Sequence, residues 1–253
     1  MALVDPVANA PAAVVDLPGE RALVIADYHA GIEVGLRYER GVELESAADE
    51  RRERVLELVA RTDADRVIVL GDLAHRIPSP EGEEHAEIDA FLDAVAARVP
   101  VTLVTGNHDA GVTDAFTERL EVVPPEGGRI GPIGFLHGHT WPNPSVLSAD
   151  VVCMGHEHPQ VRLSDSVGGS RSERAWLRGS LRVEPFRANL GESIADRWTD
   201  PDLVVFPAFN DRSGGTWINV EGESFLSPFL PDAIQDGEAY LLDGTRLGAY
   251  RSV

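Results

Sequence analysis

The chain has 253 residues, and 43% of them are hydrophobic, which is typical of a globular protein with a sizeable core and excludes a disordered or fibrous chain. No apolar run approaches the roughly 20 residues that cross a bilayer, and residues 1–20 hold no basic side chain of the kind that begins a signal peptide, so we expect a soluble, cytoplasmic protein without membrane contact. Forty-two acidic residues oppose 22 arginines with no lysine, for a net charge of −20. This composition is typical of a halophilic protein, although GC-rich coding also favours arginine over lysine.

The first half of the chain alternates predicted strands and helices. Residues 1–20 show little periodicity and are predicted to form a lead-in segment or an edge strand. Short apolar runs predict buried strands, at residues 22–26, 67–70 and 101–104. Segments with helical spacing lie between them, at residues 48–60 and 84–98. This alternation predicts an α/β domain with parallel strand pairing, whose ligands bind where the strands end.

From residue 121 the pattern becomes mostly β, with short apolar runs between Gly and Pro turns. Strands are predicted at residues 133–136, 151–154, 161–163, 175–177, 203–206, 216–220 and 239–242. The sequence has a single cysteine, Cys153, so an internal disulfide is excluded. We expect Cys153 to be a buried strand residue. Residues 164–174 and 187–202 are predicted surface loops, and without an internal repeat or linker a single domain over residues 1–253 is expected.

Five polar motifs each follow a predicted strand, and four of them hold six of the eight histidines. The motifs are Asp27-Tyr28-His29, Gly71-Asp72, Asn107-His108-Asp109, His137-Gly138-His139 and His156-Glu157-His158. Any one of them alone is more readily a structural feature, but folding does not require histidines at successive strand ends. Imidazole, carboxylate and carboxamide ligands suit Mn, Zn, Fe or Co better than Ca or Mg. Seven such ligands are too many for one tetrahedral ion and fit two ions that share a carboxylate.

The order of these motifs resembles the calcineurin-like metallophosphoesterase superfamily. Within it, the chain is similar to the archaeal and bacterial ICC-like phosphoesterases that include the DNA-ligase-associated metallophosphoesterases. That similarity rests on residues 25–29, on Gly71-Asp72-Leu73 with His75, on residues 155–159, and on residues 207–210 followed by Gly214-Gly215. The resemblance implies a four-layer αββα sandwich of the α/β class, in which helices flank two mixed β-sheets.

The resemblance also implies the ligands of two divalent ions. Asp27, His29 and His158 would hold one ion. Asn107, His137 and His156 would hold the other, and Asp72 would bridge them. Mn²⁺ is the first choice, with Zn²⁺, Fe²⁺, Ni²⁺ and Co²⁺ as alternatives.

Further residues of the motifs would act on the substrate. His108 is expected to donate a proton to the leaving oxygen, with Asp109 orienting its ring. His139, His75 and Asn210 are candidate substrate contacts. The alternative for His75 is that it ties down its own loop, and for Asn210 that it forms a turn.

Three functions remain open at this point. The first is hydrolysis of a phosphate ester in a nucleotide or small phosphodiester (phosphodiesterase or phosphatase), with a metal-bridging hydroxide as nucleophile and no covalent intermediate. The second is a nuclease acting on DNA or RNA ends, favoured by the branch resemblance but by no basic groove; the acidic charge does not exclude it, because at about 1 M salt the Debye length is only about 3 Å. The third is a non-catalytic interaction module, against which the complete ligand set and the His108-Asp109 pair argue.

Overall fold

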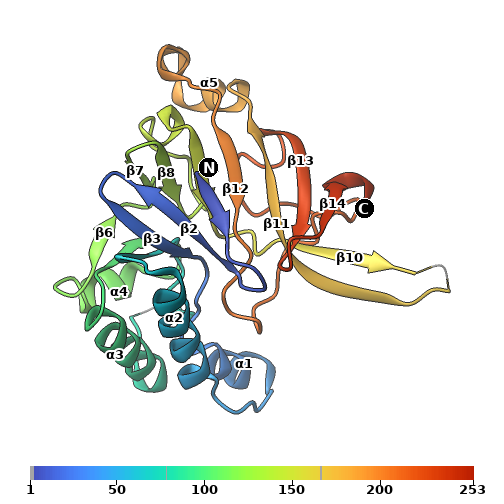
Figure 1. Ribbon diagram of the computed structural model, residues 1–253. Helices are drawn as coiled ribbons and strands as arrows, with labels where there is room; N and C mark the ends of the chain where they lie inside the picture. Colours follow the sequence, from blue (N-terminus) through green and yellow to red (C-terminus); the bar gives the residue numbers. More distant parts are fainter. Residues whose placement is uncertain (1–2, 78, 166) are drawn as a thin grey trace.

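The computed structural model describes residues 3–77, 79–165 and 167–253, which form two mixed β-sheets packed face to face with helices outside (Figure 1). The six-stranded sheet has the order β1-β2-β3-β4-β5-β6. The eight-stranded sheet has the order β14-β13-β11-β12-β9-β8-β7, and β10 pairs with β11 beside this path. The α/β sandwich expected from the sequence is confirmed.

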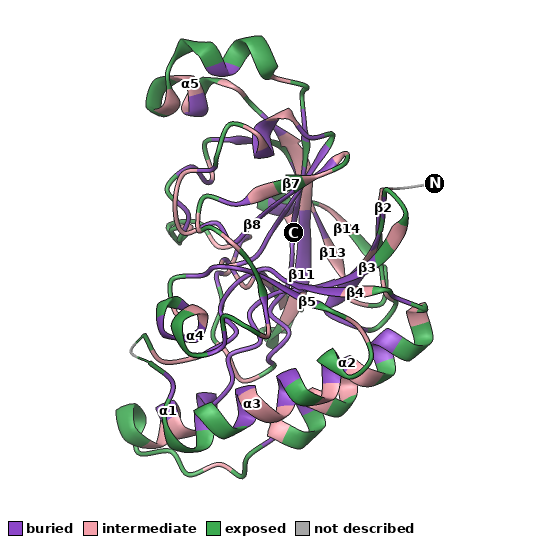
Figure 2. Ribbon diagram, turned by 90° about the vertical axis from the view of Figure 1, so that its left-hand side faces the viewer, coloured by how far each residue is buried: buried purple, intermediate pink, exposed green. Residues whose placement is uncertain are grey.

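The six-stranded sheet is parallel from β3 to β6, and β1 and β2 are added antiparallel to it. Its strands are β1 Val4–Pro6, β2 Ala12–Leu17, β3 Glu20–Ile25, β4 Arg66–Val69, β5 Val101–Val104 and β6 Glu121–Val123. Its helices are α1 Ile32–Arg40, α2 Ala48–Thr62, α3 Gly82–Ala96 and α4 Ala110–Ala115. Helices α2 and α3 connect parallel neighbours and turn their buried sides toward the sheet (Figure 2).

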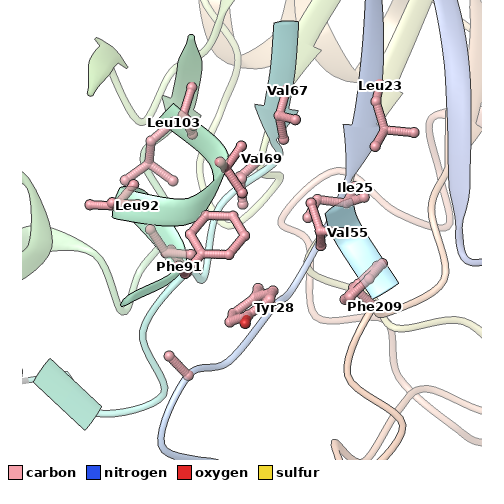
Figure 3. Close-up of a cluster of buried hydrophobic side chains, with 14 of the residues drawn as sticks. Leu23, Ile25, Tyr28, Val55, Val67, Val69, Phe91, Leu92, Leu103 and Phe209 are labelled. Atoms are coloured by element: carbon pink, nitrogen blue, oxygen red, sulfur yellow. The ribbon is translucent and has the colours of Figure 1, made fainter. Parts of the chain in front are cut away.

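A hydrophobic core fills the space between this sheet and α2 and α3. Strand residues such as Ile25 and Val69 pack there against helix residues such as Val55 and Phe91 (Figure 3). The same cluster includes Tyr28, whose ring lies 5.9 Å from that of Phe209 between centroids. The core therefore extends to the loops that follow β3 and β12, where candidate site residues lie.

The eight-stranded sheet is parallel only at its centre, where β12, β9 and β8 are neighbours. Its strands are β7 Gly128–Ile130, β8 Ile133–Leu136, β9 Val151–Met154, β10 Gln160–Ser164, β11 Ser170–Leu181, β12 Asp202–Val205, β13 Ile234–Leu241 and β14 Arg246–Ala249. Its outer face is covered by α5 Glu184–Leu190 and by short 3₁₀ turns at Val146–Ser148 and Glu192–Arg197, which contribute Phe186 and Ile194 to the core. A third 3₁₀ turn, Tyr250–Ser252, lies near the end of the chain.

The two sheets share an apolar interface. Val24 and Ile68 of the first sheet and Phe135, Cys153 and Trp176 of the second belong to one buried cluster. Strands buried on both faces read as continuous apolar runs, which is why most of them were predictable. Cys153 is fully buried in β9, as expected. No helix among the described residues combines the length and apolar character needed to cross a membrane.

Several segments differ from their predictions. Residues 1–20 contain two strands, and β2 is an inner strand paired with β3 over Ala12–Leu17. Within 164–174, Ser164 and residues 170–174 belong to strands and not to a loop: β10 and the start of β11 pair from Gln160↔Arg174 to Ser164↔Ser170 as a projecting hairpin (Figure 1). The solvent exposure of this hairpin explains why its sequence lacks an apolar pattern. Residues 187–202 contain the end of α5 and a 3₁₀ turn. Residues 216–220 form one isolated bridge instead of a strand. Positions 1, 2 and 166 of these predictions lie outside the described residues.

Candidate metal centre

Five parallel strands bring the five motifs to one place, and a sixth brings the loop of Asn210. In the first sheet β3, β4 and β5 end just before Asp27, Asp72 and Asn107, and in the second sheet β8 and β9 end just before His137 and His156. Strand β12 ends before the Phe209-Asn210 loop. The carboxyl ends of parallel strands meet at one edge of a sheet, so the two packed sheets project these side chains toward each other.

The backbone at this edge is held in an unusual conformation. Five expected ligands have positive φ: Asp27 (56°), His29 (49°), Asp72 (53°), His156 (69°) and His158 (43°). Such angles are uncommon outside glycine and cluster at functional sites. Neighbouring loops hold them in place, since Asp27 N donates to Gly71 O (3.1 Å) and His29 N to Asp72 O (2.9 Å).

Two glycines permit the close approach of these loops. A Cβ on Gly71 would lie 2.3 Å from His137 Nδ1, and one on Gly106 would lie 2.3 Å from Asp72 Oδ1. Both distances are shorter than any real contact of a side-chain carbon. The glycines before Asp72 and Asn107 are therefore required by the packing of the ligands themselves.

The first group of candidate ligands comprises Asp27, His29, Asp72 and His158, each with one ligand atom within 4.8 Å of those of the others. His158 Nε2 lies 3.2 Å from His29 Nε2 and 3.2 Å from Asp27 Oδ1. His29 Nε2 lies 3.9 Å from Asp72 Oδ2. The donor atoms thus converge on one small volume.

The second group comprises Asp72, His137 and His156 and shares Asp72 with the first. His137 Nε2 lies 3.4 Å from Asp72 Oδ1 and 3.1 Å from His156 Nδ1. The side-chain oxygen of Asn107 lies 3.1 Å from His137 Nε2, which adds the carboxamide to this group. All seven predicted ligands are therefore together, with Asp72 between the two groups.

Backbone carbonyls orient two of the imidazole rings. The Nδ1–H of His137 donates to Leu70 O at 2.7 Å, and the Nδ1–H of His158 donates to Gly214 O at 2.7 Å. Each bond leaves Nε2 directed into its group. This arrangement is the one by which proteins fix the tautomer of a metal-binding histidine.

The centre attracts positive charge. Burial alone would raise the pKa of Asp27 and Asp72, but nearby His158 and His137 outweigh it and lower both pKa values. Burial likewise opposes protonation of His137, yet the carboxylate of Asp72 raises the pKa of His137 to about 9. Both carboxylates are therefore ionised at neutral pH, in the form that binds a cation.

The rings of His29 and His156 are also in the protonation state that binds a metal ion. Burial lowers the pKa of His29 to about 3 and that of His156 to about 4, so both are neutral ligands at neutral pH. Nitrogen and oxygen donors in two groups with a shared carboxylate match a pair of divalent transition-metal ions. The residues present fit the cofactor expected from the sequence.

The model of the calcineurin-like phosphoesterase family matches residues 20–206. The chain belongs to this family. It is accordingly a hydrolase that acts on phosphoester bonds.

Individual proteins resemble this phosphoesterase to different extents. The crystal structure of the nuclease MPE of Pseudomonas putida superimposes with a TM-score of 0.60 at 20% identity, covering 96% of this chain and 100% of that one, which supports the fold. The phosphoesterase Yfce of E. coli gives a TM-score of 0.40 at 18% identity, over 90% of this chain and 96% of that one. Protein Daple of Danio rerio is 33% identical over 109 residues, which make up 42% of this chain but only 5% of Daple.

His108 lies at the rim of the candidate metal centre. Its side chain is 22% exposed, and its Nε2 lies 3.8 Å from Asp72 Oδ2. Its Nδ1 contacts the carbonyl of His75, which orients the ring. A partly exposed imidazole beside the shared carboxylate is in the right place to meet a substrate.

Asp109 does not orient the His108 ring, contrary to the prediction. Its carboxylate is fully buried and accepts backbone N–H bonds from Asp72 (2.7 Å), Leu73 (2.9 Å), Ala74 (3.2 Å) and Gly106 (2.9 Å). Asp109 therefore holds together the loops after β4 and β5. The sequence pattern places Asp109 beside His108 but does not show where its side chain points.

Asn210 is also occupied by the backbone. It is 1% exposed, donates from Nδ2 to Tyr28 O (3.0 Å) and His29 O (3.2 Å), and accepts from Arg212 N (2.9 Å). These bonds favour the alternative expected for Asn210, a turn residue, over a substrate contact. Asn210 ties the loop after β12 to the loop that carries His29.

His75 and His139 lie against the predicted ligands. The His75 ring is 5.3 Å from that of His29 and 6.0 Å from that of His108, between centroids. The His139 ring is 5.3 Å from that of His137. Both Nδ1 atoms are buried without a hydrogen-bond partner among the described residues. Their roles as substrate contacts stay predictions.

The sequence reading overlooked Glu157, which lies between two expected ligands. It is fully buried and accepts from Ser227 N (2.7 Å), Leu226 N (3.0 Å) and Thr216 Oγ1 (3.2 Å). Glu157 thereby attaches the loop of residues 216–227 to the histidine motif. The signal available was its position, as an acidic residue between two expected ligands in a motif that follows a strand.

Proposed function

We propose that this phosphoesterase hydrolyses phosphodiesters at a centre of two divalent ions, with Mn²⁺ the first choice. The observation that supports this proposal most directly is the pair of ligand groups that share Asp72. Asp27, His29 and His158 would complete one site, and Asn107, His137 and His156 the other. Bound there, the ions would lower the pKa of an attacking water and withdraw negative charge from the phosphoryl oxygens.

The protein's own residues supply the rest of the proposed chemistry. His108 would donate a proton to the leaving oxygen from Nε2, while the His75 carbonyl holds its Nδ1 side. His139 and His75 would face the substrate oxygens beside the second and first groups. The reaction would proceed without a covalent enzyme intermediate, with water as the attacking nucleophile.

A direct assay tests this proposal. The purified protein would be given bis-p-nitrophenyl phosphate and, separately, p-nitrophenyl phosphate, with Mn²⁺, with other divalent ions, and with chelator. We expect the diester to be cleaved only with metal and Asp72→Asn to be inactive, since Asp72 serves both groups. If the wild-type protein binds Mn²⁺ yet cleaves neither compound with any metal, the proposal of diester hydrolysis at this two-ion centre is refuted.

A nuclease acting on DNA or RNA ends is the second candidate. The motif resemblance to the DNA-ligase-associated branch favours it, and the nuclease MPE shares the fold. Single- and double-stranded oligonucleotides with free or blocked ends separate the two candidates. Cleavage of the oligonucleotides at rates well above those for nucleotide diesters would favour the nuclease.

We also propose that the protein works in concentrated salt within the cytoplasm. The net charge of −20 and the absence of lysine support the concentrated salt of this proposal. In such salt, long-range repulsion between the protein and a nucleic-acid substrate would be largely screened.

A further inference from the structure

A cluster of charged side chains is buried between α1, α2 and α3. We call Glu33, Arg51, Glu87 and Arg212 the arginine–glutamate cluster. Arg51 is 6% exposed, Glu33 2% and Glu87 7%, so three ionisable groups are almost removed from water. Burying such charges costs free energy unless each charge is paired. Well-packed apolar residues in the same place often give a protein equal or greater stability. The cluster therefore calls for an explanation beyond stability.

Arg51 uses its guanidinium to join two helices. Its Nη1 and Nη2 pair with both oxygens of Glu33 on α1 at 2.5 and 2.9 Å, while Nε and Nη2 bond the two oxygens of Glu87 on α3, each at 2.9 Å. Two-pronged pairing of this kind fixes geometry as well as charge. Arg51 thus sets where both carboxylates lie.

Glu87 links Arg51 to the loop that carries His29. Its Oε2 also accepts the N–H of Gly31 at 2.8 Å. Gly31 precedes α1 with φ of 75° and stands two residues after His29. The cluster consequently anchors the end of the turn whose left-handed conformation directs His29 into the first ligand group.

Glu33 links Arg51 to the loop that orients His158. Its Oε1 pairs with Arg212 Nη1 at 2.5 Å, and the Arg212 backbone N–H donates to Asn210 at 2.9 Å. Two residues further on, Gly214 O accepts the Nδ1–H of His158 at 2.7 Å. Arg212 therefore lies in the loop that orients His158.

The second ligand group is held by other contacts. His137 is oriented by Leu70 O, and the backbone N–H of His156 donates to Asp27. Within the described residues, none of the cluster's hydrogen bonds reaches His137, His156 or Asn107. The cluster's own hydrogen bonds therefore reach the loops of His29 and His158 and not the side chains that belong to the second group alone.

We propose that the arginine–glutamate cluster positions His29 and His158 and so sets the metal affinity of the first group independently of the second. The inference rests on the proposed function, because it requires a metal ion at each group. Its four members are positioning residues, since they act through the two histidines and not on the substrate.

Arg212→Met tests the proposal with little risk to folding. Arg212 is 28% exposed on its side chain, and Glu33 has a second partner in Arg51, so we expect the change to leave that pair in place. The change is made in two backgrounds: His137→Ala, which leaves the first group, and His158→Ala, which leaves the second. Mn²⁺ affinity is measured by isothermal titration calorimetry, and folding is checked by circular dichroism.

We expect Arg212→Met to weaken Mn²⁺ binding about 10-fold in the His137→Ala background, as loss of a residue that supports a ligand usually does. Affinity in the His158→Ala background should not change. Arg66→Met is the matched control: Arg66 is a partly buried arginine paired with Glu20 and Glu121 at the start of β4, away from the ligands. It should lower the melting temperature without altering either affinity.

Equal weakening in both backgrounds, or none in either, would overturn the proposal while leaving the metal centre intact. If the wild-type protein binds no Mn²⁺, Zn²⁺ or Ni²⁺ at all, the proposed function fails and this inference fails with it. Selective weakening at the first group alone supports it.

Discussion

Asp109 shows how a single side chain can serve the metal centre without touching it. Both its oxygens accept backbone N–H groups of the loop that carries Asp72. One of those bonds comes from Asp72 itself, a residue with positive φ. The carboxylate therefore compensates part of the energy of an unfavourable backbone conformation.

Replacing Asp109 with Asn should disturb this loop. An amide retains one acceptor oxygen and turns an NH₂ group toward backbone donors, so we expect a loss of about 2–3 kcal/mol in the free energy of unfolding. Denaturant titration measures the loss, and calorimetry should show weaker Mn²⁺ binding. An unchanged stability combined with a changed pH profile of kcat would instead restore the predicted partnership with His108.

The effect of replacing His108 on kcat should depend on how strongly the leaving oxygen needs a proton. If its Nε2 protonates the leaving oxygen, His108→Ala should lower kcat by about 10²–10⁴-fold on a diester with an alkyl leaving group. The effect should be much smaller on bis-p-nitrophenyl phosphate, whose nitrophenolate leaves without a proton. Equal losses on both compounds would point to substrate binding and not to proton transfer.

At the scale of elements, helix α1 forms a wall of the site. Gly35 lies on this helix, and a Cβ there would be 2.4 Å from Cδ2 of the His75 ring. Because that ring stacks near His108, the helix determines how close the two histidines can be.

Gly35→Ala separates helix stability from site geometry. Alanine favours the helix by about 1 kcal/mol over glycine, but its Cβ must displace His75. We therefore expect near-normal thermal stability with a clear fall in kcat/KM. In the double variant Gly35→Ala/His75→Ala the imidazole ring no longer occupies the space of the new Cβ, so its kcat/KM should equal that of His75→Ala alone. A much lower kcat/KM in the double variant would show that the alanine damages the protein elsewhere.

The elements also show what the sequence could and could not reveal. Strands β5, β8 and β9 have the predicted limits, since burial on both faces makes them continuous apolar runs. The hairpin of β10 and β11 lacks that pattern because it projects into solvent, and β2 was hidden in an Ala- and Pro-rich segment.

At the candidate site, the convergence of the candidate ligands was more predictable than the contacts that support them. His137 and His158 were recognisable because their spacing and strand-end positions have no structural reason. The role of Asp109 was misjudged because a motif does not reveal the direction of a side chain. Arg51 could have been found, since it lies four residues before buried Val55 on the same face of α2.

For the whole molecule, the dominant feature is its charge of −20. Repulsion among so many carboxylates opposes the compact state and is relieved by screening. The melting temperature should therefore rise steadily as KCl increases, by about 2–4 °C for each kcal/mol of repulsion removed. Sorbitol, which is uncharged, serves as the control; a melting temperature that is flat or falls in KCl would contradict a halophilic protein.

The centre itself is tested most directly by a crystal structure with Mn²⁺, read from anomalous scattering. We predict two anomalous peaks on either side of Asp72, one in contact with Asp27, His29 and His158 and the other with Asn107, His137 and His156. A single peak, or peaks that do not share Asp72, would contradict the two-ion centre.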